Sequence, residues 1–434
     1  MISVWSAHAE LPRFETMSGD QATDVLIIGG GMAGLLCAYF LQQQGADYLL
    51  VEGSRILGGV TKNTTAKITS QHGLIYDKLL RGVGPEKAQM YLRVNEAAVH
   101  KFRELCQGID CGFEDKDAYV YSLDDRSVIE DELTALSELN YPEAEFVQKL
   151  PLPFPVQGAI RFKNQAQFHP LQFGGAIAKG LRIYENTFVT GFAGMTAMTT
   201  QGKIRAKRIV FATHFPILNK HGAYFMKMYQ HRSYVIALEN APDVHGMYLD
   251  EAQKGMSFRN YQGYLLVGGG DHRTGKKGGG WKELRDFASR HYPNATERYH
   301  WATQDCMTLD SAPYIGAYSE GTEGLFVATG FNKWGMTSAM VSAMVLSDML
   351  AGKKNKFSAV FYPSRSMLKP QLFLNALEAT AGLLTFSSKR CPHLGCALKW
   401  NALERTWDCP CHGSRFEANG RLIDNPATGN LKED

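Results

Sequence analysis

The most constraining feature of this sequence is a glycine-rich segment between an apolar strand and a helix near the N-terminus. Residues 24–28 are rich in β-branched and leucine side chains, residues 33–44 have the apolar spacing of a helix, and residues 48–51 form a second apolar run that ends at Glu52. Gly29-x-Gly31-x-x-Gly34 lies at the turn, so the order predicts a parallel βαβ unit. A pyrophosphate can approach the helix N-terminus there, and Glu52 is placed to bind a ribose. The unit predicts a dinucleotide site, for NAD or FAD.

Length and charge predict a multidomain protein that acts on small molecules. The chain has 434 residues, more than one core usually organises. Its 46 Lys and Arg balance 43 Asp and Glu, which gives no reason to expect nucleic acid or an acidic membrane surface as a partner. No stretch is apolar enough to span a membrane, and residues 1–24 lack the pattern of a signal peptide. We therefore expect a cytoplasmic protein.

Later segments of the chain are expected to add further strands to the same parallel sheet. Apolar strands are expected at residues 208–212 and 324–328, and a helix at residues 336–351. Amphipathic helices are expected within residues 77–107, and extended segments at residues 156–168 and 258–267.

Four of the eight cysteines lie between residues 391 and 411, in a pattern typical of a metal site. Cys391-Pro-His393 and Cys409-Pro-Cys411-His412 form C-x-H and C-x-x-H pairs. Two thiolates on one iron and two imidazoles on the other are the ligands of a Rieske [2Fe–2S] centre, so Cys391, His393, Cys409 and His412 are the predicted ligands. Zinc is the alternative, although zinc modules usually begin with a longer C-x2-4-C spacing.

Several motifs resemble the D-amino-acid oxidase and glycine oxidase superfamily. Residues 24–59 resemble its N-terminal FAD fingerprint, residues 59–72 resemble the segment around the pyrophosphate and the flavin edge, and residues 310–316 with 329–337 resemble its second FAD motif. The resemblance implies FAD rather than NAD. It also implies a doubly wound, glutathione-reductase-like α/β FAD-binding domain with an inserted α+β substrate domain. The implied FAD-binding residues are Gly29, Gly31, Met32, Ala33, Gly34, Glu52, Gly53, Ser54, Gly59, Thr61, Thr64, Thr65, Ala66, Lys67, Val189, Ala212, Thr213, Gly316, Gly330, Trp334, Gly335, Met336 and Thr337.

The C-terminal segment, including WDCPCHGSRF at residues 407–416, resembles Rieske proteins. The resemblance implies a small all-β module with a disulfide between Cys396 and Cys411, as in Rieske proteins of cytochrome bc complexes. Phe416 stands where high-potential members have a tyrosine that donates to a ligand sulfur, so we expect a lower reduction potential. Only residues 383–390 are available for strands before the first cluster loop. The module is therefore expected to be truncated and either to lean on the rest of the chain or to hold a labile cluster.

The substrate side departs from the family pattern. Glycine oxidase-like members carry an Arg that binds the substrate carboxylate, but the aligned stretch here begins with Asp305. This favours an amine, or a substrate with a basic group, unless Arg259 replaces the missing Arg. A salt-bridged or solvated loop residue is an equally good interpretation of Asp305. No catalytic set is visible, and the candidates are Lys67, His72, His272, Asp305 and Trp334.

The expected organisation is discontinuous. Residues 1–80, 155–225 and 300–355 are assigned to FAD binding, 81–154 and 226–299 to the substrate domain, 356–380 to a linker, and 381–434 to the Rieske-type module. The hypothesis is a dehydrogenase that oxidises the C–N bond of an amine or amino-acid-like molecule. Electrons would pass from FAD to the cluster and on to an external acceptor, which could be a ferredoxin-like protein, a quinone or O2. The alternatives are an amine oxidase that uses O2 beside a structural or vestigial cluster, and a non-catalytic redox sensor or electron carrier.

Overall fold

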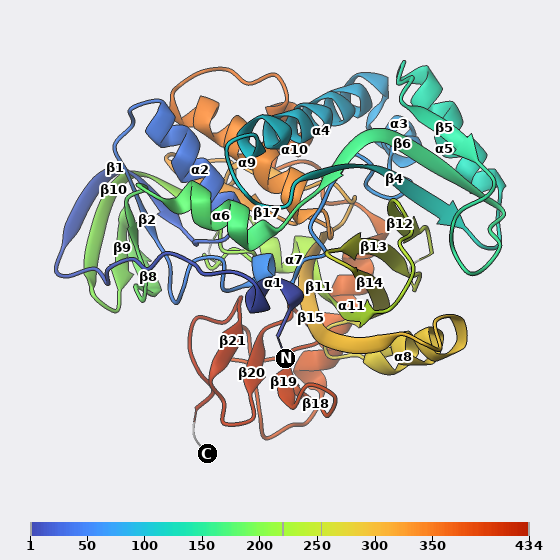
Figure 1. Cartoon of the computed structure of the whole chain (residues 1–434). Helices are drawn as coiled ribbons and strands as arrows, with labels where there is room; N and C mark the ends of the chain where they lie inside the picture. Colours follow the sequence, from blue (N-terminus) through green and yellow to red (C-terminus); the bar gives the residue numbers. More distant parts are fainter. Residues whose placement is uncertain (1, 219–220, 253, 433–434) are drawn as a thin grey trace.

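Three β-sheets organise the chain in the computed structural model, which describes residues 2–218, 221–252 and 254–432 (Figure 1). The first sheet has the order β16-β17-β10-β1-β2-β7, with β8 and β9 beside β10. Strands β17, β10, β1, β2 and β7 run parallel. The bounds are β1 Gln21–Ile28, β2 Tyr48–Val51, β7 Ile183–Tyr184, β8 Val189–Ala193, β9 Thr196–Thr199, β10 Gly202–Phe211, β16 Tyr314–Ala317 and β17 Leu325–Thr329.

Helices pack on the first sheet as the sequence predicts. Helix α2 (Met32–Gln43) packs against α9 (Gly335–Leu350), and α9 also contacts α4 (Pro85–Cys106). Because α2 and α9 are covered on several sides, most of their residues are apolar or small. The predicted doubly wound α/β fold is confirmed. The shorter helices near this layer are α1 Val4–Ala7, η1 Val60–Asn63, α6 Pro170–Ala178 and α10 Ser358–Phe361.

The second sheet has the order β15-β11-β14-β13-β12-β4-β6-β3, with β5 beside β6. Strands β6 and β15 belong to it, although most of their residues fall in segments assigned above to FAD binding. Its strands are β3 Lys67–Ile68, β4 Glu114–Ser122, β5 Ala144–Val147, β6 Gly158–Gln167, β11 Met228–Glu239, β12 Met247–Asp250, β13 Ser257–Tyr261, β14 Tyr264–Arg273 and β15 Thr296–Thr308. The helices around it are α3 Tyr76–Val83, α5 Ser127–Glu138, α7 Tyr224–Lys227 and α8 Gly280–His291.

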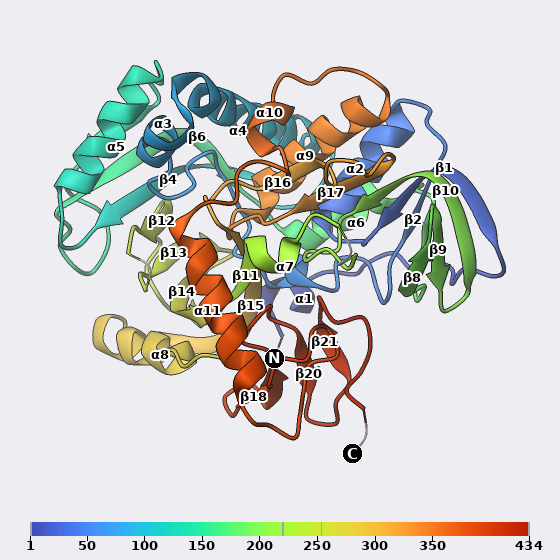
Figure 2. The same ribbon diagram turned by 180° about the vertical axis from the view of Figure 1, so that it is seen from behind.

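The third sheet is a small antiparallel one at the C-terminus, which confirms the predicted all-β module. Its strands are β18 Lys399–Asn401, β19 Thr406–Asp408, β20 Arg415–Glu417 and β21 Leu422–Asp424. Residues 383–390 add no strand to it, and the expected linker contains α10 and most of α11 (Pro370–Leu384). Figure 2 shows α11 running beside this module. In the described ranges, no helix is long and apolar enough to cross a membrane.

Candidate functional site

A cavity of about 1230 Å³ lies where the carboxyl ends of the parallel strands face the second sheet. Ligand pockets usually measure about 300–1,000 Å³, so this one has room for a large cofactor and a substrate together. Most of the predicted FAD-binding residues line it: Gly29, Gly31, Met32, Ala33, Glu52, Gly53, Ser54, Gly59, Thr61, Thr64, Thr65, Lys67, Val189, Ala212, Thr213, Trp334, Gly335 and Met336. The predicted residues that do not line it are Gly34, Ala66, Gly316, Gly330 and Thr337.

The glycine turn after β1 supports the dinucleotide end of the cavity. A side chain at Gly34 would overlap the carbonyl oxygen of Gly29, so the turn can be this tight only with glycine there. Glu52 Oε2 accepts a hydrogen bond of 2.7 Å from Gly30 N, and Oε1 accepts one of 2.9 Å from Ser54 N. Burial raises the pKa of Glu52, while these amides oppose that shift. The carboxylate is thus held beside the helix N-terminus, an arrangement that fits the adenosine end of FAD.

The opposite end of the cavity is lined by charged side chains from the second sheet. Asp305 on β15 is the cross-strand neighbour of His231 on β11, and Asp271 on β14 forms an ion pair with Lys333. Burial raises the pKa of Asp305 to about 6, against the opposing charge of Lys333. Burial, together with Lys333, lowers the pKa of His231 to about 3, so its imidazole is neutral.

Several polar atoms at this end have no partner among the described residues. They are His231 Nδ1, Ser233 Oγ, Asp271 Oδ1 and Thr303 Oγ1, and all are buried. Unsatisfied buried polar atoms are rare in folded proteins, so a group of four around one cavity indicates a polar ligand. Sequence reasoning found only Asp305 of the side chains at this end.

The other catalytic candidates lie in different places. Lys67 and Trp334 line the cavity, and burial lowers the pKa of Lys67 to about 7. His72 lies behind Trp334, with ring centroids 4.9 Å apart, and does not reach the cavity. His272 points away from it and contacts the Tyr234 hydroxyl at 2.9 Å. Arg259 is buried and donates to the Thr65 and Ala66 carbonyls, so it does not replace the missing substrate Arg.

The predicted cluster ligands come together on two loops, residues 391–396 and 409–414, which we call the cluster loops. Cys391, Cys409 and His412 are buried and His393 is half-buried. The rings of His393 and His412 lie 4.9 Å apart. The contact with Cys409 is the main reason that the pKa of Cys391 falls to about 7, and the Ser414 hydroxyl contributes.

These cluster loops fit a two-iron centre. Burial lowers the pKa of His412 to about 3, and its Nδ1 has no partner in the part of the chain that the structure describes. A neutral imidazole with a vacant ring nitrogen and a thiol with a lowered pKa, as in Cys391, are forms that bind iron.

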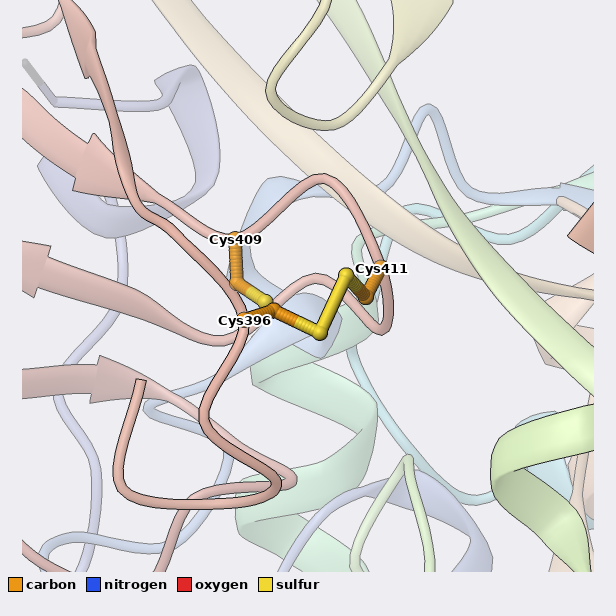
Figure 3. Close-up of side chains that lie close together, drawn as sticks. All are labelled: Cys396, Cys409 and Cys411. Atoms are coloured by element: carbon orange, nitrogen blue, oxygen red, sulfur yellow. A yellow bond between two sulfur atoms is a disulfide. The ribbon is translucent and has the colours of Figure 1, made fainter. Parts of the chain in front are cut away.

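A disulfide joins the two cluster loops. Cys396, Cys409 and Cys411 bring their sulfur atoms within 4.8 Å of one another (Figure 3). Cys396 and Cys411 form the disulfide, with Cα atoms 6.6 Å apart, and this is the pair that the Rieske resemblance implies. Of the three, Cys409 alone keeps a thiol that can bind iron.

Strand β11 separates the cavity from the cluster loops, and its side chains alternate between them. Tyr229, His231 and Ser233 are half-buried and line the cavity. Gln230 and Arg232 are buried on the other side, where they contact the C-terminal module. Tyr234 also contacts the module, through Glu404, although part of this residue lines the cavity. Because successive side chains of a strand point to opposite faces, one strand serves both sites.

Two glutamines of the second sheet hold the cluster loops by their backbone. Gln230 Nε2 donates to the His412 carbonyl at 2.8 Å, and Gln304 Nε2 donates to the Gly413 carbonyl at 2.8 Å. Asn425 of the module donates to the Thr213 and Phe215 carbonyls at 2.6 Å, directly after β10. Thr213 also lines the cavity, so the module contacts the wall of the predicted FAD site.

A buried ion network completes this contact. Glu404 of the module pairs with Arg232 of β11 and with Arg415 of its own sheet, and no side chain of the three is more than 6% exposed. Tyr234 also donates to Glu404, at 3.0 Å. The pKa of Glu404 is lowered although burial alone would raise it, because both arginines favour its charged form.

Comparison with known proteins agrees with both sites. A family model described as FAD dependent oxidoreductase matches residues 24–349, and a Rieske [2Fe-2S] domain model matches residues 363–433. YhfW of Bacillus subtilis (strain 168), named as a Rieske 2Fe-2S iron-sulfur protein, is 34% identical over 492 aligned positions, which cover 99% of this chain and 96% of that protein. These matches favour iron–sulfur over zinc at the cluster loops.

Solved structures agree with the fold of the larger part of the chain. Glycine oxidase from Geobacillus kaustophilus has a TM-score of 0.64 at 20% identity, covering 80% of this chain and 99% of that chain. L-proline dehydrogenase from P. horikoshii has a TM-score of 0.66 at 16% identity, covering 80% of this chain and 98% of that chain. At these identities the likeness concerns the fold alone.

Proposed function

Because this chain belongs to the FAD dependent oxidoreductase family and carries a Rieske [2Fe-2S] domain, we propose that it is a dehydrogenase for C–N bonds. Its substrate is an amine or amino-acid-like small molecule, and the electrons leave through the cluster of its own C-terminal module to an external acceptor. When bound, FAD supplies a two-electron acceptor for hydride, and the cluster carries one electron at a time. The protein supplies binding, orientation and charge.

The substrate end of the cavity favours a cationic amine. Asp305 and Asp271 both face it, while Lys333 is already paired with Asp271. An ammonium group can pair with the Asp305 carboxylate, and Ser233 and Thr303 offer hydroxyl oxygens to its N–H groups. Hydride leaves a carbon only when the neighbouring nitrogen is neutral, so the ammonium must first lose a proton. Asp305 can accept that proton at a carboxylate oxygen, since its pKa of about 6 is close to neutral pH.

The double role of β11 is the observation that carries the relay part of the proposal. His231 lines the cavity, and its two chain neighbours Gln230 and Arg232 hold the module on the other face. His214 also lines the cavity and lies against Gln230, whose amide binds the His412 carbonyl. Neighbouring residues of one strand thus contact both sites, so a path through β11 and its side chains can carry electrons between them.

Anaerobic stopped-flow spectroscopy of the holoprotein with a panel of amines tests the proposal. We expect flavin absorbance to bleach first and cluster absorbance to follow. An inert cluster with rapid peroxide formation in air would establish the O2-using oxidase instead, and no bleaching with any amine would establish the redox sensor or carrier.

A matched variant isolates the relay. Cys409→Ser removes a predicted iron ligand on the side of β11 away from the cavity. We expect the rate of flavin reduction by substrate to be unchanged, while turnover with a one-electron acceptor such as ferricyanide is lost. Equal turnover with and without the cluster would contradict the relay.

A further inference from the structure

Helix α11 exposes its large apolar residues, whereas an ordinary surface helix buries them. Its polar and small residues face the protein: Asn375 is buried and bonds Arg273 and the Met226 carbonyl, and Gly382 lies against the Cys411 sulfur. Its large apolar residues face outward. Six apolar side chains on the helix and its flanks are 53–97% exposed: Leu368, Phe373, Leu374, Leu377, Leu384 and Phe386. A patch of this kind marks an interaction surface.

Among the described residues, the polar side chains on and beside the outward face of α11 donate within the helix. The hydroxyls of Thr380 and Thr385 bond the carbonyls of Ala376 and Ala381 within the helix. Glu378 is the single charged residue between positions 370 and 388, and it pairs with Lys276 of the protein body at 2.7 Å. A protein interface normally has about one hydrogen bond per 100–200 Å². In the described part of this helix the hydroxyl donors and the carboxylate are engaged within the protein, so its outward face is better suited to lipid hydrocarbon.

Positive charges flank this apolar face. Lys369 precedes the helix and Arg390 follows it. Lys369 lies near Asp310, whose carboxylate already forms an ion pair with Arg365, and Arg390 forms no ion pair with a carboxylate among residues 2–218, 221–252 and 254–432. Arg390 donates instead to the Leu383, Thr385 and Gly395 carbonyls, which leaves its charge uncompensated. Apolar side chains between cations match the interface of an anionic bilayer. The balanced net charge of the whole chain conceals this local arrangement.

We propose that α11 and its flanks, residues 368–390, bind the surface of an anionic lipid bilayer, with Phe373 and Leu377 inserted among the acyl chains. Helical periodicity places Leu384 on the same side as these two residues. The helix is also continuous with the cluster site. The Gly382 carbonyl accepts from Ala397 N, and Arg390 joins the end of the helix to the first cluster loop. Binding therefore brings the cluster loops next to the membrane, where a lipid-soluble acceptor is within reach.

Vesicle flotation of the purified holoprotein tests the proposal. The probes are vesicles of phosphatidylcholine alone and vesicles mixed equally with phosphatidylglycerol. We expect binding to the mixed vesicles. Removing an inserted Leu or Phe lowers a partition constant by about tenfold, so Phe373→Glu with Leu377→Glu should lower it by at least about a hundredfold. Lys369→Gln should weaken binding to the mixed vesicles alone, by about fivefold.

Val83→Glu with Leu123→Glu is the matched control, because those side chains are 40% and 41% exposed and lie on α3 and after β4, away from α11 (Figure 2). It adds the same charge and should leave binding unchanged. Flavin and cluster spectra verify that every variant is folded. The proposal is overturned if the wild type binds neither vesicle or if the Phe373/Leu377 variant still binds. It is also overturned if that variant changes the oligomeric state without lipid, since a second copy would then cover the helix. The readout is binding, so the result does not depend on the proposed reaction.

Discussion

Arg232→Ala is expected to weaken the docking of the C-terminal module on β11. Arg232 binds Glu404 through two nitrogens, and their side chains are 3% and 1% exposed. Breaking a buried ion pair costs about 3–5 kcal/mol, because the remaining charge stays buried without its partner. Glu404 keeps its pairing with Arg415 and the hydroxyl of Tyr234, so we place the cost at the lower end, at about 3 kcal/mol.

Guanidinium unfolding of the holoprotein, followed by the visible circular dichroism of the cluster, measures this cost. Arg298→Ala is the control: Arg298 makes a similar pair with Glu239, but the side chains are 53% and 36% exposed. An exposed pair contributes about 0–1 kcal/mol, so the control should barely move the midpoint. The effect of Arg232 should also diminish at low pH. The pKa of Glu404 is lowered in the folded state, so its contribution is present above the ordinary value of 4.5 and is lost as the pH falls. Equal midpoints for the two variants at neutral pH would refute the reasoning.

Three further perturbations test the two sites separately. Because burial raises the pKa of Asp305 to about 6, the wild type should show a rise in the KM for a cationic amine as the pH falls through about 6, and Asp305→Asn should abolish that rise in steady-state kinetics. The same variant should be more stable than the wild type above that pH in thermal unfolding, because the buried charge of Asp305 costs free energy there. Gly413→Ala should abolish the cluster EPR signal, because its Cβ would lie 2.5 Å from the Gln230 Cβ, whereas Gly395→Ala, with a similar positive φ and open space, should cost only about 1 kcal/mol. Phe416→Tyr should raise the reduction potential of the cluster in an EPR-monitored redox titration, and an unchanged potential would mean that the added hydroxyl does not reach a ligand sulfur.

The parts of both sites that lie in contiguous motifs could be predicted from the sequence. The glycines and Glu52 belong to one βαβ unit, and Cys391, His393, Cys409 and His412 belong to two short loops. Local chemistry and spacing are sufficient in such segments, because the backbone geometry that they require is itself local.

The faces of the second sheet could not be predicted in the same way. His272 was a catalytic candidate, but its neighbour Asp271 lines the cavity and His272 lies on the opposite face. Such a one-residue difference reverses the direction of a side chain, and the register comes from pairing with β11, which is distant in sequence. A signal did exist in β11, where polar residues from Gln230 to Ser233 leave neither face apolar. That pattern indicates contacts on both faces of β11, but it does not identify Glu404 as a contacting residue.

The composition of the C-terminal module explains why it needs the rest of the chain. Four of the seven residues in its buried apolar cluster are cysteines, so it buries little hydrocarbon. Modules this small depend on disulfides, metals or docking for their stability. Here the docking groups are the buried charges of Arg232, Glu404 and Arg415, and separation would leave Arg232 without its carboxylate. Because separation from β11 would cost the module these buried ion pairs, the docked position is favoured. The same contacts that stabilise this small sheet therefore fix its position relative to the cavity.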